Sequence, residues 1–398
     1  MMKFVKILFS CLFFGFIQSN ILAQEEKPKT FFVNGYLKEM ISANDLGDSA
    51  LMDNLIHNRL NFKWYPNDNF RFYGALRTRL FIGQTSKYLE NFEDFIDYDT
   101  YYFDLNWTPI NENGVVLNTM IDRLYMEWII ENLTVKLGRQ RINWGINTIW
   151  NPNDIFNAYS YFDFDYEERP GIDALRTEYY TGTNSSIEVA ISLPSKTINP
   201  DSTAMNIFSS ALMYKTNKWG YDFQFMGGYS RENWVLGAGW AGNLGSASLK
   251  GEFTYFYPKE ETEADPKAFV GSISLDHSIG KLFYNISYLF NESGYKNLGA
   301  EGLIQLNSRA LTAKNLSPYK HSGFVQTSYQ AHPLINAGFG MMLFPQNKAM
   351  FLSPFATWNV FQDFDLDFIV QAFYAEDTSR DKFRSYSTSY FLRGKWSF

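Results

Sequence analysis

The last fifteen residues, Arg384-Ser385-Tyr386-Ser387-Thr388-Ser389-Tyr390-Phe391-Leu392-Arg393-Gly394-Lys395-Trp396-Ser397-Phe398, alternate in character along their length. Aromatic and aliphatic side chains dominate one set of alternate positions, while serine, arginine and lysine dominate the other. Successive side chains of a β-strand point to opposite faces of its sheet. The pattern therefore predicts a strand with one apolar face and one polar face.

Similar alternating segments, separated by turn residues, extend back to Phe31. Links after even-numbered segments are short, such as Glu131-Asn132, and those after odd-numbered segments are mostly longer. This asymmetry is typical of outer-membrane barrels, which have short periplasmic turns and long extracellular loops. We predict an all-β fold, a transmembrane antiparallel up-and-down β-barrel of 16 to 18 strands. The eighteen predicted strands are residues 31–42, 56–65, 70–82, 119–130, 133–143, 174–181, 187–193, 205–215, 219–229, 234–242, 246–257, 268–276, 282–291, 321–330, 335–344, 351–360, 364–374 and 384–398.

The N-terminus predicts export. Lys3 and Lys6 precede an apolar run, and Ala23 ends a small-residue cleavage site. We expect residues 1–23 to be a signal peptide, 24–30 a short periplasmic segment and 31–398 the barrel. Cys11 is the only cysteine and lies in the signal, so the mature chain is expected to have no disulfide. Aromatic residues make up 18% of the chain, as in barrels with aromatic girdles around a polar interior.

Several function classes are excluded by charge and motif content. The formal charge of −7 gives no global attraction to nucleic acid. The four histidines do not form a Ser-His-acid arrangement with neighbouring strands, and no zinc, phosphate-loop or dinucleotide spacing appears. We expect no enzyme activity, cofactor or metal.

Period-two alternation also predicts the residues that line the barrel interior, many of them basic. One interpretation is a strip that attracts anionic solutes. The other is a network of ion pairs with Glu127, Glu178, Asp365 and Asp367 that fills the interior. The alternation places Asp122 on the outward face, near the rim. The predicted pore-lining residues are Lys38, Arg59, Arg71, Arg77, Arg79, Arg123, Arg139, Arg141, Arg176 and Arg393.

The long link at residues 144–173 is rich in aromatic rings and acids, which argues against disorder. We predict that it folds into the barrel mouth and narrows the pore, with rings suited to stacking sugars. The alternative is a plug or rim that only stabilises the barrel. The predicted constriction residues are Trp144, Trp150, Asp154, Tyr161 and Asp165.

Three short motifs carry a family resemblance: Gly138-Arg139-Gln140, Trp144-Gly145 and Asn151-Pro152. Together they resemble a pattern in porin-like outer-membrane barrels, including alginate-export-type and capsule-anchoring barrels. The resemblance implies that Arg139 and Arg141 lie near the pore mouth. The final strand, ending on Phe398, resembles the signal by which Gram-negative barrels are recognised for assembly. Residues 20–24 and the abundance of Asn, Tyr and Phe resemble Bacteroidota porins.

Two functions follow as expectations. The first is a passive outer-membrane channel for small hydrophilic solutes, anionic or sugar-like. The second is a non-conducting barrel that exports or binds surface polysaccharide, or scaffolds an outer-membrane complex. The expected partners are outer-membrane lipid, the barrel assembly machinery and the solutes or polysaccharide.

Overall fold

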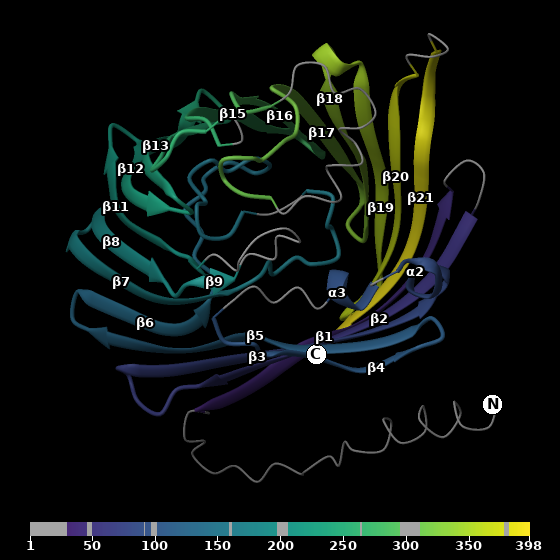
Figure 1. The fold of residues 1–398 in the computed structure, drawn as a ribbon, viewed down its shortest axis with the longest axis horizontal. Coiled ribbons are helices and arrows are strands. Elements are labelled where there is room, and N and C mark those ends of the chain that lie inside the picture. Colours follow the sequence, from purple (N-terminus) through teal and green to yellow (C-terminus); the bar gives the residue numbers. More distant parts are fainter. Residues whose placement is uncertain are drawn as a thin grey trace.

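The computed structural model describes residues 30–45, 50–90, 92–96, 102–158, 161–196, 206–262, 265–294, 311–377 and 382–398. The predicted signal peptide and most of the predicted periplasmic segment lie outside these residues. The chain forms a closed antiparallel barrel of eighteen strands, as predicted (Figure 1). Its strands are β1 (Phe31–Asp45), β2 (Ala50–Trp64), β3 (Phe70–Gly83), β5 (Val115–Ile130), β6 (Leu133–Gln140), β7 (Ile172–Gly182), β8 (Ser185–Ser192), β11 (Ser209–Lys218), β12 (Tyr221–Ser230), β13 (Asn233–Leu244), β14 (Ala247–Pro258), β15 (Ala268–Ile279), β16 (Leu282–Asn291), β17 (His321–His332), β18 (Ile335–Phe344), β19 (Ala349–Phe361), β20 (Phe364–Asp377) and β21 (Lys382–Ser397).

The barrel closes where the first strand pairs with the last. β1 and β21 are antiparallel, with Tyr36 opposite Ser397 and Asp45 opposite Thr388. Every other barrel strand pairs with its sequence neighbours in the barrel, so the topology is up-and-down. Closure removes the free sheet edges that would otherwise leave backbone groups unpaired.

The link between β3 and β5, where the sequence pattern predicts no strand or helix, contains additional elements. These are α2 (Gln84–Tyr88), α3 (Phe92–Ile96) and β4 (Asn106–Glu112), which pairs with β5. Two more short strands, β9 (Ser195–Lys196) and β10 (Asn206–Ile207), pair with each other, and η1 (Pro345–Asn347) is a single 3₁₀ turn. None of the helices among the described residues is long and apolar enough to cross a membrane.

The expected difference in link length holds only in part. The link after β1 was predicted to be long, but pairing runs from Phe31↔Trp64 to Asp45↔Ala50. Only Arg231 and Glu232 separate β12 from β13, although this link follows an odd-numbered barrel strand. In both places polar residues continue the strands beyond the apolar alternation, so hydrophobic periodicity underestimates strand length.

The outward prediction for Asp122 is wrong. The β3–β5 register shifts there, with Ala75 opposite Arg123 and Leu76 opposite Ile121, so Asp122 is the extra residue of a β-bulge. Its side chain is fully buried. Because of the bulge, the inward-facing residues before Asp122 and those after it do not share one two-residue period. Strict alternation therefore predicts the wrong face for Asp122.

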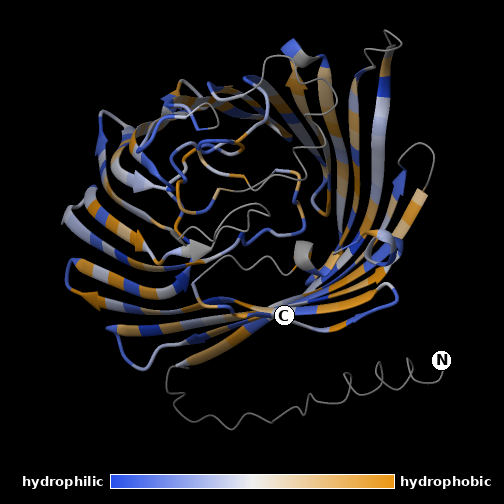
Figure 2. Cartoon of the chain, viewed as in Figure 1, coloured by the Kyte–Doolittle hydropathy of each residue, from blue (hydrophilic) through white to orange (hydrophobic). Residues whose placement is uncertain are grey.

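Hydrophobic and hydrophilic residues alternate along many of the strands (Figure 2). The exposed large apolar side chains include aromatic residues toward both ends of the strands. One group of aromatic residues lies near the strand ends that meet the short turns, with side chains partly or largely exposed: Trp64, Phe70, Trp128, Trp219 and Phe361. Trp64 stacks on Phe72 with ring centroids 5.0 Å apart, and Phe70 on Trp128 at 5.7 Å. A second group lies toward the opposite strand ends: Trp107, Trp234, Tyr257, Phe269 and Phe383.

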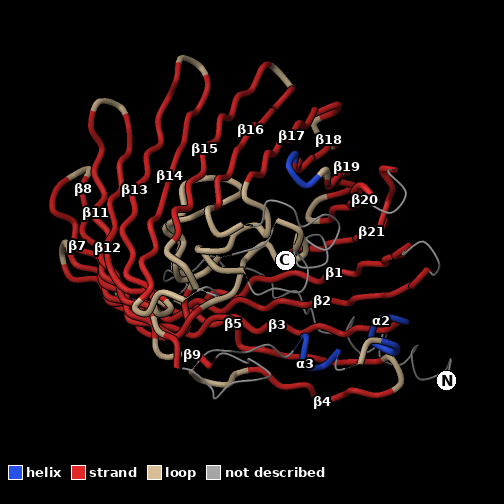
Figure 3. The backbone as a smooth tube through the Cα atoms, turned by 45° about the horizontal axis from the view of Figure 1, so that its top comes forward, coloured by secondary structure: helices blue, strands red, loops and turns tan. Residues whose placement is uncertain are grey.

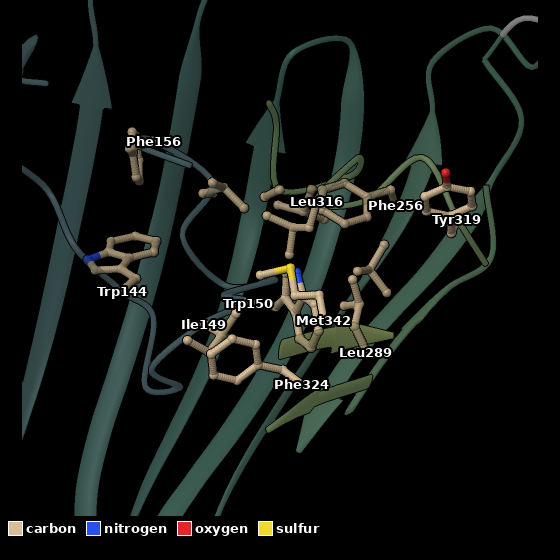
Figure 4. Packing of buried hydrophobic residues seen from close by; sticks show 14 of the residues in the cluster. Trp144, Ile149, Trp150, Phe156, Phe256, Leu289, Leu316, Tyr319, Phe324 and Met342 are labelled. Carbon is tan, nitrogen blue, oxygen red and sulfur yellow. The ribbon is translucent and has the colours of Figure 1, made fainter. Parts of the chain in front are cut away.

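The interior holds loop segments, which Figure 3 shows gathered inside the ring of strands. The main hydrophobic cluster joins the link between β6 and β7 to inward-facing residues of β8 and β11–β20. Leu316 and Tyr319, from the link between β16 and β17, complete it, and Tyr319 stacks on Phe344 with centroids 4.3 Å apart (Figure 4). The apolar core of this molecule therefore lies inside the barrel.

Candidate functional site

The described residues of the link between β6 and β7, 141–158 and 161–171, fold into the barrel and are called the inward loop below. Gly138 has a φ of 120°, a backbone region that favours glycine, and it lies just before β6 ends. A Cβ on Gly145 would collide with the side chain of Asn151. The glycines of the Gly-Arg-Gln and Trp-Gly motifs thus permit the departure from the strand and a close turn within the loop.

The first half of the inward loop is hydrogen-bonded to polar residues on the inner faces of β12–β15. Gln224 donates to the carbonyl of Trp144 at 2.6 Å, and Ser272 donates to the carbonyl of Trp150 at 2.8 Å. Thr254 donates to the carbonyl of Pro152 at 2.8 Å. These side chains supply partners for loop backbone groups that water cannot reach.

Glu252 on β14 is the central anchor of this half. Its buried carboxylate accepts the backbone N–H groups of Ile146 (3.3 Å), Asn147 (3.1 Å) and Asn153 (3.4 Å). Three donors converging from the loop fix its position against the wall. The sequence analysis missed Glu252, although a lone acid at an inward position of a Ser- and Thr-containing strand was a usable signal.

Two of the three predicted constriction rings, Trp144 and Trp150, are packed instead of open to a solute (Figure 4). Trp144 and Trp150 are buried, and Trp144 meets Phe156 edge-on with centroids 5.0 Å apart. The indole of Trp144 donates to Glu188 on β8 at 2.6 Å. Since both tryptophans are enclosed, they present no open surface on which a sugar could stack in this conformation.

Asp154 is also enclosed rather than placed at the edge of a pore. One carboxylate oxygen accepts the backbone N–H of Trp144 at 3.3 Å, and the residue is fully buried. Burial raises the pKa of Asp154 to about 7, although this N–H and the charges of Arg141 and Arg169 oppose the rise. The carboxyl therefore titrates near neutral pH.

Residues 161–169, which we call the strap, carry the inward loop to the wall formed by β1–β3 and β21. Asp165 is its central contact. Its carboxylate lies 3.0 Å from the ammonium of Lys38, 2.8 Å from Nδ1 of His57 and 3.4 Å from the guanidinium of Arg393. Burial alone would raise the pKa of Asp165, but the His57 hydrogen bond and the Lys38 charge hold that pKa well below its usual range.

The rest of the strap contacts neighbouring cations. Glu167 lies 2.9 Å from Lys395, and Arg123 donates to the carbonyls of Glu168 (2.9 Å) and Arg169. The ring of Tyr166 lies under the guanidinium of Arg77, 3.7 Å from its centroid, and its hydroxyl donates to Asp122. The bulged residue Asp122 is thus a partner of the strap.

Eight of the ten predicted pore-lining cations fall into three groups. Lys38, Arg59, Arg77 and Arg393 are buried near the strap, so they border no open channel here. Arg79 donates to the carbonyl of Ile96 and to Asn118. Arg71, Arg123 and Arg176 keep some exposure and pair with acids: Arg71 with Glu127 (3.5 Å), Arg123 with Asp122 (3.0 Å) and Arg176 with Glu188 (2.6 Å).

The expected ion-pair network is present and larger than predicted. Glu127, Glu178 and Asp367 form ion pairs with basic side chains. Glu188, Asp122 and the acids of the strap form further ion pairs. Asp365 instead accepts the amide of Asn359 at 3.0 Å.

Arg139 fills a gap in the barrel wall, contrary to its expected place at the pore mouth. Along one edge of β5, β6 pairs with residues 124–130, and β4 pairs with residues between Val115 and Met120. Residues 121–123 of β5 lie between these two pairings. Arg139 enters this gap and donates to both carboxylate oxygens of Asp173, at 2.9 and 3.1 Å. It is fully enclosed, while Arg141 lies half-buried at the start of the inward loop.

Two cavities lie near the strap, but only the first is lined by residues of the strap. One of about 270 Å³ lies between it and the inner faces of β19 and β20, with Asp163, Glu167 and Arg169 among its lining residues. Tyr161 also lines it, and its ring meets Phe324 with centroids 4.9 Å apart. The other, about 280 Å³, is lined by Lys63, Arg123, asparagines and tyrosines of β1–β5. Among the described residues, no group of three or more His, Cys, Asp or Glu side chains is arranged to hold a metal ion.

The comparisons with known proteins establish a likeness of fold. No family model and no curated protein matches the chain, so the resemblances to alginate-export-type, capsule-anchoring and Bacteroidota barrels stay predictions. Pseudomonas aeruginosa OccK8 (OprE) has a TM-score of 0.59 at 10% identity, over 92% of this chain and 98% of its own. Acinetobacter baumannii OccAB4 has a TM-score of 0.59 at 10% identity, over 93% and 98%. Pseudomonas aeruginosa OccK5 (OpdH) has a TM-score of 0.58 at 7% identity, over 92% and 98%.

Proposed function

We propose that this protein is an outer-membrane channel through which small hydrophilic solutes, anionic or sugar-like, pass passively. The observation that carries the proposal is the closed barrel with an apolar, aromatic-ended outer face and a cation-bearing inner wall. The likeness of fold to the Occ structures, which are those of outer-membrane channels, supports it.

A specific observation favours a second candidate. The first half of the inward loop is packed as a core, and the acids of the strap contact four cations of the wall, Lys38, Arg59, Arg393 and Lys395. A barrel filled in this way also suits a non-conducting protein that binds or exports surface polysaccharide, or that scaffolds a complex.

Planar-bilayer recording of the refolded full-length mature chain separates the two candidates. A channel gives steady current steps proportional to voltage, and liposomes containing it swell in small solutes faster than in large ones. Lys136 on β6, like Arg71, is a partly exposed partner of Glu127, at 2.8 Å. If the wall cations select anions, Arg71→Glu with Lys136→Glu shifts the reversal potential toward cations. A correctly folded barrel that passes no current and causes no swelling would eliminate the channel proposal in favour of the second candidate.

A further inference from the structure

The acidic side chains of the strap contact basic side chains of β1, β2 and β21, as the carboxylates of a bound solute would. Three of the four consecutive residues 165–168 are acidic, and each contacts at least one cation of β1, β2 or β21. The contacts are Asp165 to Lys38 (3.0 Å) and Arg393 (3.4 Å), Glu167 to Lys395 (2.9 Å) and Arg393 (3.5 Å), and Glu168 to Arg59 (3.9 Å).

These contacts differ in how readily water reaches them. The Asp165 side chain is 11% exposed, whereas the side chains of Glu168 and Glu167 are 27% and 44% exposed. Ion pairs whose carboxylate stays open to water are weak, because water solvates the ions when the pair separates. The two glutamates can therefore exchange for another anion at a smaller cost than Asp165 can.

We propose that the strap is an internal ligand: Asp165, Glu167 and Glu168 occupy a binding site for a solute that carries two or more carboxylates, and such a solute binds by displacing them. The inference rests on the proposed channel function, because displacement of the strap would clear part of the interior. A solute with one carboxylate cannot replace contacts to several cations at once, so the site selects for multiply charged solutes.

The two cavities reach the edges of this contact, although neither is lined by Lys38, Arg59, Arg393 or Lys395. Lys63 and Arg123 line the 280 Å³ cavity, and Arg123 also donates to the carbonyls of Glu168 and Arg169. A carboxylate entering this cavity meets a guanidinium that already holds the strap. Glu167 lines the 270 Å³ cavity, so the strap is reachable from there as well.

The strap also differs from the first half of the inward loop in how it is held. That half is fixed by backbone hydrogen bonds to Glu252 and to uncharged inner-wall residues, and it contributes the buried tryptophans. The strap is held in two ways: Tyr161 and Phe162 pack against the hydrophobic cluster, whereas the acids of residues 165–168 contact basic side chains of the wall. An added anion competes with charge contacts but not with a hydrophobic core, so displacement can be confined to residues 165–168.

The test uses a synthetic tetrapeptide with the sequence of residues 165–168 as the probe. Its counterpart, in which amides replace the three acids, is the control peptide. Binding is measured by calorimetry on the full-length mature barrel folded in detergent. The variants are Asp165→Asn/Glu167→Gln/Glu168→Gln and, should that triple change impair folding, Glu167→Gln/Glu168→Gln. A matched variant is Glu260→Gln/Glu261→Gln, in an exposed loop beyond β14.

We expect the acidic peptide to bind the strap variants at least tenfold more tightly than the wild type or the matched variant, because the internal competitor is removed. The amide peptide should not distinguish the proteins. Equal binding of the acidic peptide to all proteins, or equal binding of both peptides to the strap variants, would overturn the inference. Tighter binding to the strap variants in a barrel that passes no current would support the inference and contradict the channel function. Current through the barrel without tighter binding would support the channel function and contradict the inference.

Discussion

The carboxylate of Asp165 lies 3.0 Å from the ammonium of Lys38, although 127 residues separate them, and the Lys38 side chain is 1% exposed. A charge this enclosed depends on its partner, because an unpaired buried ion is costly. In a double-mutant cycle with Lys38→Met and Asp165→Asn, we expect a coupling energy of about 1–3 kcal/mol in urea unfolding.

The pair Lys348–Glu376 provides the control, since its atoms are 2.6 Å apart but the lysine side chain is 64% exposed. Its coupling energy should stay below about 1 kcal/mol. Equal coupling in the two pairs would mean that burial does not strengthen the Asp165–Lys38 contact.

Glu252→Gln should loosen the first half of the inward loop. The amide keeps one acceptor oxygen where the carboxylate accepts three loop N–H groups, so at least one buried donor loses its partner. We expect a loss of about 1–3 kcal/mol in the free energy of unfolding. Limited proteolysis followed by mass spectrometry should show new cleavage within residues 141–158. Glu260→Gln, on an exposed loop, should show none, and an identical cleavage pattern in both variants would contradict the anchoring role.

Asp154 should make stability fall as pH rises. Its folded-state pKa is about 7, above the value of about 3.9 for an unfolded aspartate, so between these values the folded chain holds a proton that the unfolded chain has lost. The wild type should lose about 3 kcal/mol between pH 4 and pH 7 that Asp154→Asn retains. Urea unfolding of both proteins at several pH values measures this difference, and parallel pH profiles would disprove the assignment.

Arg139→Met should destabilise the barrel wall by about 3–5 kcal/mol, because it leaves Asp173 buried without its cation. The double change Arg139→Met/Asp173→Leu should recover much of this loss. Arg71→Met serves for comparison, since the Arg71 side chain is 42% exposed and its loss should cost less than about 1 kcal/mol. Similar melting temperatures for Arg139→Met and Arg71→Met would argue against a wall-filling role.

The strands were predictable because each alternates against lipid-facing positions, and turn residues mark most of their ends. Asp122 was placed on the wrong face because a single bulge residue shifts the parity without changing the composition. The positions of Trp144 and Trp150 could not be predicted either. A polar inner face of serine, threonine and glutamine can border water or form hydrogen bonds with a loop equally well. The strand sequence therefore does not say whether water or a loop fills the barrel.

The strap contacts the first and the last strand of the same barrel, which bears on the order of assembly. Closure sets Lys38 opposite Lys395, with Arg393 two residues away on β21, and so brings like charges together at the seam. Asp165 and Glu167 neutralise that seam from within. Closing the barrel with the strap already inside is therefore electrostatically more favourable than closing it without these acids, because closure alone brings the cations of the two ends together.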